Sequence, residues 1–207
     1  FAKWRAVYPV TDTLPSQGCY TANAHALARY AALCQEHDIV PIVEPEVLMD
    51  GDHDLTRSFE VTQHAQQTVF AALADQAVDL RGIVLKPSMV ISGAGAADRA
   101  GIKEVAQQTL RCLLSTVPAA VPGIAFLSGG QSDEEATQHL NTMNEIGGSL
   151  PWAVTFSYGR ALQAAAMKRW AGHSDNVESA RQVAFHRAQM NGAAALGQYS
   201  SEMEKAA

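Results

Sequence analysis

Short apolar runs that end in polar residues recur along the chain at a nearly constant spacing. They occupy residues 2–5, 39–44, 82–87, 123–128 and 152–157. The polar residues Lys3, Glu44, Lys86 and Ser128 are separated by 41, 42 and 42 positions, and Arg160 follows Ser128 by 32. Each interval can hold a strand, a helix and two loops. The pattern predicts repeated strand–helix units.

The segments between these runs have the period of amphipathic helices. Ser132, with Glu135 three positions later, forms a capping-box sequence that predicts a helix start. Apolar strands that alternate with helices predict a parallel sheet covered by helices. Two helix faces illustrate the period: Leu27, Tyr30, Ala31 and Cys34, and Ile102, Val105, Ala106, Thr109 and Leu113.

An open doubly wound sheet and a closed barrel both fit this alternation. The open sheet predicts a glycine-rich turn after one strand and an acidic residue about 20 positions later, and no such turn is found. Polar groups at the ends of several strands favour an α/β protein of the TIM (β/α)8 barrel class. Such a barrel needs eight units and about 250 residues. We therefore expect residues 1–207 to form one domain that carries the last five units, with the first three strands missing.

Composition narrows the partners that we expect. The chain is 47% hydrophobic and 17% charged, and its net charge is −6. A negative chain is a poor partner for nucleic acid or an anionic membrane. Three scattered cysteines do not suggest a disulfide framework, and no signal peptide is visible. We expect a cytoplasmic enzyme without a nucleic-acid or membrane partner.

Lys86 is the strongest candidate for chemistry. It ends an apolar strand, and Pro87 follows it. A desolvated ammonium near another cation loses its proton easily, and the neutral amine attacks carbonyl groups. The alternative is a lysine that packs its methylenes and extends its charge into solvent.

Two loops have the features of anion sites. Gly129 and Gly130 follow Ser128 at a strand end, where backbone N–H groups can approach an anion closely. Gly159 and Arg160 open a predicted helix whose first N–H groups are free. A Gly-Gly pair alone is more often a simple turn.

The acidic segment 50–54 suggests a metal site at first sight. It has one histidine and lacks the spacing of a calcium loop. We expect no metal there, and we expect Asp54 to cap the following helix.

Six segments in order resemble class I fructose-1,6-bisphosphate aldolase, from the first residue to about Gly197. They are residues 1–5 (FAKWR), 40–46 (VPIVEPE), 50–54 (DGDHD), 85–87 (LKP), 126–132 (FLSGGQS) and 155–162 (TFSYGRAL).

The resemblance implies a metal-free reaction without a cofactor. In it, Lys86 forms a Schiff base with the ketone of a sugar phosphate, and the electron-poor iminium permits carbon–carbon cleavage. Lys3 is implied as the neighbouring cation, or it is a surface lysine. Glu44 is implied as the acid and base that makes and breaks the imine, held at its strand end by Pro45.

Further residues receive binding roles from the resemblance. Glu46 would support the site, or it is a solvated loop carboxylate. Arg5 would contact substrate or nearby carboxylates, or form an ion pair in the barrel mouth. The expected ligands of the phosphate nearest the Schiff base are Ser128, Gly129, Ser157, Gly159 and Arg160.

The family implies a homotetrameric enzyme of glycolysis and gluconeogenesis acting on small-molecule sugar phosphates. It also places a further aspartate and lysine on earlier strands, which cannot be located here. Two other functions stay open. A transaldolase-like or deoxyribose-phosphate aldolase-like enzyme would keep Lys86 without needing both phosphate loops. A non-catalytic scaffold would not need the retained charged residues.

Overall fold

The computed structural model describes residues 1–206. Five parallel strands form one sheet in the sequential order β1-β2-β3-β4-β5. Three short 3-10 segments lie at Leu80–Gly82, Ser174–Asn176 and Ser201–Ala206. The strands and helices are β1 (Ala2–Tyr8), α1 (Gln17–Glu36), β2 (Pro41–Val47), α2 (Leu55–Asp75), β3 (Val84–Leu85), α3 (Ile102–Thr116), β4 (Gly123–Phe126), α4 (Asp133–Ile146), β5 (Ala153–Phe156), α5 (Arg160–Trp170) and α6 (Val177–Ala194).

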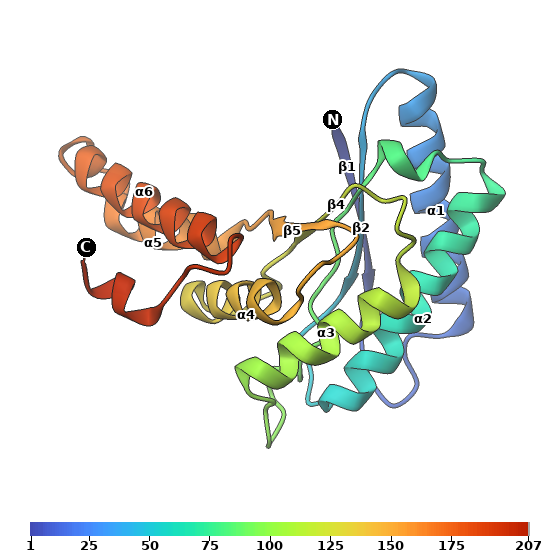
Figure 1. The fold of residues 1–207 in the computed structure, drawn as a ribbon, viewed down its shortest axis with the longest axis horizontal. Helices are drawn as coiled ribbons and strands as arrows, with labels where there is room; N and C mark the ends of the chain where they lie inside the picture. Colours follow the sequence, from blue (N-terminus) through green and yellow to red (C-terminus); the bar gives the residue numbers. More distant parts are fainter. Residues whose placement is uncertain (207) are drawn as a thin grey trace.

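The sequential strand order agrees with the barrel prediction. An open doubly wound sheet reverses its order at a switch point, whereas each strand here pairs with the next along the chain. Figure 1 shows α1 and α2 along one side of β1 and β2, and α3 next to α2, while α5 and α6 extend away from them. These are five consecutive strand–helix units of an α/β barrel.

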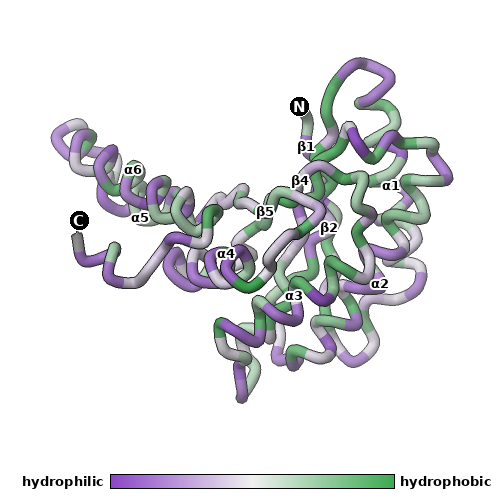
Figure 2. The backbone as a smooth tube through the Cα atoms, viewed as in Figure 1, coloured by the Kyte–Doolittle hydropathy of each residue, from purple (hydrophilic) through white to green (hydrophobic). Residues whose placement is uncertain are grey.

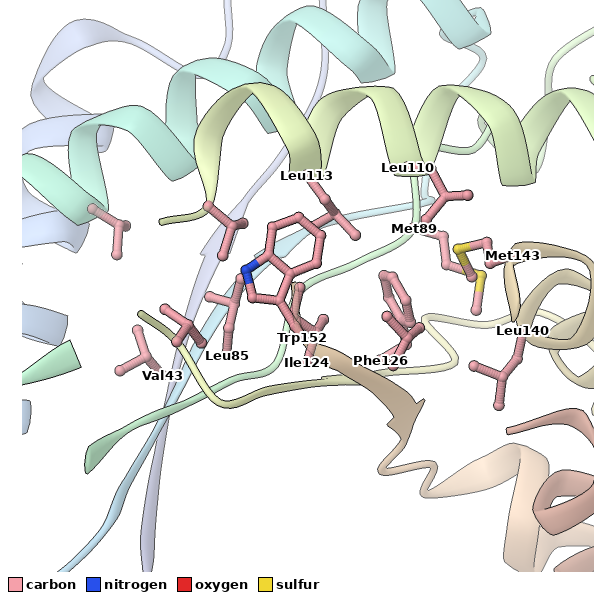
Figure 3. Close-up of a cluster of buried hydrophobic side chains, with 14 of the residues drawn as sticks. Val43, Leu85, Met89, Leu110, Leu113, Ile124, Phe126, Leu140, Met143 and Trp152 are labelled. Carbon is pink, nitrogen blue, oxygen red and sulfur yellow. The ribbon is translucent and has the colours of Figure 1, made fainter. Parts of the chain in front are cut away.

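The core lies between the strands and the helices. Val43, Leu85 and Ile124 on neighbouring strands are fully buried and contribute to one large apolar cluster. Figure 3 shows how side chains of this cluster, including Leu113 and Trp152, fill the space beneath α3. In Figure 2, hydrophobic segments run along the strands, while the helices alternate between polar and apolar positions. The helix periodicity in the sequence is therefore explained by burial of one face.

Two helix caps agree with the sequence predictions. The Ser132 hydroxyl accepts a hydrogen bond from the Glu135 amide at the start of α4. The Asp54 carboxylate does the same for the Arg57 amide at the start of α2. Each side chain satisfies one N–H group that the first helical turn leaves unpaired.

The predicted strand ends were wrong for the first two strands. Lys3, Arg5 and Glu44 lie within strands, because β1 continues to Tyr8 and β2 to Val47. Pro45 lacks an N–H, but β2 remains paired with β1 as far as the Tyr8 and Val47 positions. Pairing with β1 thus overrides the local stop signal.

No helix among residues 1–206 is long and apolar enough to cross a membrane.

Candidate active site

Four charged side chains project from one face of β1 and β2. Alternation along each strand places Lys3 and Arg5 on the same face of β1, and Glu44 and Glu46 on the same face of β2. Arg5 and Glu44 are register partners. The opposite face of β1 contacts α1 and contains buried apolar residues such as Ala6. Strand pairing therefore brings together residues about 40 positions apart.

Glu44 lies between two lysines. One carboxylate oxygen, Oε1, is 3.2 Å from the Lys86 Nζ, and the other, Oε2, is 2.6 Å from the Lys3 Nζ. Glu44 is 3% exposed and Lys86 is 8% exposed, whereas 40% of the Lys3 side chain is exposed. A carboxylate at this depth requires positive partners, and the two ammonium groups supply them. One buried carboxylate can therefore exchange protons with Lys86.

Lys86 is held where β3 ends. Its backbone N–H donates to the carbonyl oxygen of Val43 on β2 at 2.8 Å, so its position is set by the sheet. Its side chain is buried rather than extended into solvent, which contradicts the alternative of a snorkelling lysine. Pro87 follows, and its carbonyl oxygen accepts from the Leu127 amide beyond β4. The lysine segment is thereby joined to the segment that leads to Ser128.

Arg5 and Glu46 form an ion pair through the Arg5 Nε. The hydrogen bond to Glu46 raises the pKa of Arg5 above its ordinary value, against the opposing effect of burial. Glu46 lies within β2 and is 6% exposed, so the alternative of a solvated loop carboxylate is wrong. Its ionic partner is an arginine. Substrate contact by either residue stays a prediction.

The two predicted anion loops meet in space. A Cβ atom added to Gly130 would lie 3.7 Å from the Arg160 Nη2. Gly129 and Gly130 have φ values of 59° and 102°, the left-handed region that favours glycine. Among the described residues, no hydrogen bond uses the N–H of Gly129 or Gly130. These donors and the Arg160 guanidinium can face one anion together.

The other predicted phosphate ligands lie beside these loops. Ser128 is buried two residues after the end of β4, and Ser157 is exposed directly after β5. The Ser157 amide donates to the Phe126 carbonyl oxygen at 2.8 Å, which aligns the two strand ends. Gly159 is the N-cap of α5, and no hydrogen bond among the described residues uses the amides of Arg160 and Ala161, so these two N–H groups can bind an anion.

The acidic segment 50–54 is not arranged as a metal site. Within residues 1–206, no group of three or more His, Cys, Asp or Glu side chains could hold a metal ion. His53 is buried, and this burial lowers its pKa. Its carbonyl oxygen accepts from the Gly93 amide at 2.8 Å, so the segment packs against the loop that follows β3.

Sequence reasoning missed two features of the site. One is the bridging position of Glu44, because Lys3 was expected to act on Lys86 as a neighbouring cation. The other is the buried side chain of Gln131, which follows the glycine turn and contacts His139 on α4. No sequence signal indicates that a glutamine next to an exposed turn will be buried.

The fold and the site define an α/β-barrel protein with a buried lysine in contact with a buried carboxylate. The family model "Fructose-bisphosphate aldolase class-I" matches residues 1–207. The chain is 56% identical, over 96% of its length, to the "Probable fructose-bisphosphate aldolase class 1" of Xanthomonas campestris. It is 52% identical over 96% of its length to fructose-bisphosphate aldolase B of Gallus gallus.

A solved structure agrees with these sequence matches. The fructose-bisphosphate aldolase of Plasmodium falciparum, crystallised with TRAP and a small-molecule inhibitor, superposes on 97% of this chain with a TM-score of 0.95 and 45% identity. This chain covers 58% of that structure, 60% of the Xanthomonas protein and 55% of the Gallus protein. The chain belongs to the class I fructose-bisphosphate aldolase family.

An expected loss of phosphate affinity tests the position of Arg160. Replacing Arg160 by alanine should raise the KM for fructose 1,6-bisphosphate, the substrate that we propose for the intact protein, by roughly 10- to 100-fold, because one charge-assisted contact is lost. The KM for fructose 6-phosphate, which lacks the phosphate next to the ketone, should change little. Steady-state kinetics on both substrates measure the difference. Arg169→Ala, at an exposed position of the same helix, is the matched control. An equal rise for both substrates would contradict the assignment.

Proposed function

We propose that the protein containing this chain reversibly cleaves fructose 1,6-bisphosphate to dihydroxyacetone phosphate and glyceraldehyde 3-phosphate. It would be a carbon–carbon lyase of the aldehyde-lyase class that serves glycolysis and gluconeogenesis. The observation that carries the proposal is the Glu44 carboxylate, which contacts both Lys86 and Lys3. The family membership supports the choice of substrate.

Substrate binding would use the two anion loops. The phosphate next to the ketone would accept hydrogen bonds from the free amides of Gly129 and Gly130 and pair with Arg160. Because these loops follow β4 and β5, and Lys86 follows the neighbouring β3, the ketone would be directed toward Lys86. Binding energy from the phosphate would thus orient the carbonyl for attack.

Imine formation would be the first chemical stage. The Lys86 ammonium first gives a proton to Glu44, 3.2 Å away, and the neutral Nζ then attacks the ketone carbon. Glu44 returns this proton to the ketone oxygen, so that a carbinolamine forms. It then takes a second proton from the nitrogen and delivers it to the hydroxyl group. Water leaves as the carbon–oxygen bond breaks, and the product is an iminium. Lys3 would stabilise the carboxylate form of Glu44 between transfers.

Carbon–carbon cleavage would follow. The bond between the third and fourth substrate carbons breaks, its electron pair moves toward the iminium, and an enamine forms on Lys86. The proton of the fourth-carbon hydroxyl passes to a base, which is predicted to lie on a strand outside this chain. Glyceraldehyde 3-phosphate leaves. Protonation of the enamine and hydrolysis of the imine, with Glu44 acting in reverse, release dihydroxyacetone phosphate.

The experiment that tests this function is covalent trapping in the presence of a chelator. The intact protein is incubated with dihydroxyacetone phosphate, excess EDTA and borohydride, and peptides are mapped by mass spectrometry. We expect a reduced adduct on Lys86 and a cleavage rate unaffected by EDTA. Loss of activity with EDTA, or no adduct on a folded and intact protein, would overturn the Schiff-base mechanism. Lys103, exposed on α3, is the internal control site and should remain unmodified.

We also propose that the intact protein is a cytoplasmic homotetramer. Large apolar side chains are exposed on α5, α6 and the segment after α6, among them Met167, Phe185 and Leu196. Such side chains are suited to contacts between subunits. Light scattering coupled to size-exclusion chromatography measures the mass of the assembly.

A further inference from the structure

Gln131 is buried, although it belongs to the turn that presents the anion-binding amides. Its exposed fraction is 6%, whereas its neighbours Gly130 and Ser132 are exposed. A buried amide needs partners for both its oxygen and its nitrogen. The Gln131 Oε1 lies 2.7 Å from the Nδ1 of His139, and its Nε2 donates to the sulfur of Met89 at 3.6 Å.

The two partners determine the orientation of the amide and the tautomer of the histidine. The Met89 thioether can only accept, so the Gln131 nitrogen faces it and the oxygen faces His139. His139 must then carry its proton on Nδ1. Burial, and secondarily the positive charge of Arg99, lowers the pKa of His139 to about 4. The ring is therefore neutral at pH 7, and Nδ1 supplies its one N–H.

The turn needs an anchor of this kind. Two consecutive glycines in left-handed geometry have many alternative conformations, and ordering them costs more entropy than ordering other residues. One backbone hydrogen bond closes the turn, from the Gln131 amide to the Ser128 carbonyl oxygen at 3.0 Å. The side-chain contacts of Gln131 add a second constraint at the same end. Donors fixed before the anion arrives bind it more strongly than mobile ones.

The same contacts connect the turn to the lysine segment. Met89 lies three residues after Lys86. Between them, the Pro87 carbonyl oxygen accepts a hydrogen bond from the Leu127 amide at 3.2 Å. His139 is on α4, the helix that begins directly after the turn. Gln131 therefore joins the turn to α4 on one side and to the segment that carries Lys86 on the other.

We propose that Gln131 and His139 are positioning residues that hold the Ser128–Gln131 turn in its anion-binding form, and that His139 acts through Gln131. The proposal rests on the proposed function, in which this turn binds the phosphate next to the ketone. Both side chains are buried, so we expect neither to touch the substrate. Their effect is expected on binding of that phosphate and not on the chemistry at Lys86.

The test compares His139→Leu with His139→Asn in the intact protein. Leucine removes the donor, whereas the asparagine amide nitrogen occupies nearly the position of Nδ1. We expect His139→Leu to raise the KM for fructose 1,6-bisphosphate about fivefold, the effect of one lost hydrogen bond. The KM for the monophosphate lacking the phosphate next to the ketone should not change. His139→Asn should restore the bisphosphate KM to within about twofold of the original value.

Gln131→Met, which removes both side-chain contacts of Gln131 at similar volume, provides an independent variant should His139→Leu not fold. We expect the same selective rise in KM, and we expect the double variant to be no worse than Gln131→Met alone. An equal effect of leucine and asparagine at position 139, an equal rise for both substrates, or additive effects in the double variant would overturn the proposal. Borohydride trapping distinguishes failure of this positioning role from failure of the proposed function. If the proposed function is wrong, no adduct forms on Lys86 of the original protein.

Discussion

Replacing Lys86 by methionine is expected to lower kcat for cleavage of fructose 1,6-bisphosphate by about 10⁴-fold or more. Methionine keeps the length of the side chain but has no amine, so no iminium can form to accept the electrons of the breaking bond. Binding of the phosphate should persist, because the Gly129–Gly130 turn and Arg160 are untouched. Steady-state kinetics measure the first effect, and equilibrium binding of dihydroxyacetone phosphate measures the second.

Two controls make the Lys86 result interpretable. Lys103→Met alters an exposed lysine on α3 and should keep full activity. In Lys86→Met, Glu44 keeps only Lys3 as its ionic partner. Thermal unfolding of this variant shows whether the protein still folds. Substantial turnover by folded Lys86→Met would mean that another group forms the covalent intermediate or that none is needed.

Replacing Glu44 by glutamine is expected to slow imine formation and imine hydrolysis by about 10²- to 10⁴-fold, the usual contribution of a positioned acid and base. Glutamine keeps the shape and can still accept a hydrogen bond from Lys86, but it cannot take up a proton at neutral pH. Rapid-quench trapping with borohydride measures the rate at which the adduct on Lys86 appears. Glu44→Gln should therefore slow the appearance of the adduct, while the final amount of adduct should be similar to that of the original protein.

Glu46→Gln is the matched control for Glu44→Gln. Glu46 is on the same face of β2 and is also buried, but its ionic partner is Arg5 rather than a lysine. We expect its imine kinetics to change much less. If Glu44→Gln left the rate of adduct formation unchanged, or if both variants slowed it equally, proton transfer would have to be assigned to another group.

Much of the fold could be predicted because its causes are local. Apolar runs form strands and periodic stripes form helices because each must bury its hydrophobic face. The caps Ser132 and Asp54 were also predictable from local sequence, because each needs only an amide three residues away. Strand ends were less predictable. Pro45 is a local stop signal, but pairing with β1 carries β2 past it.

The sequence alone determined the family, the alternation of strands with helices, and the residue types that can perform the chemistry, above all Lys86 and the glycine turn. The tertiary structure decided which of these groups meet. Parallel pairing and burial place Glu44 between Lys86 and Lys3, pair Arg5 with Glu46, and turn Gln131 inward to His139. These contacts join residues that are distant along the chain, and their geometry depends on sheet register and packing, which no local pattern encodes.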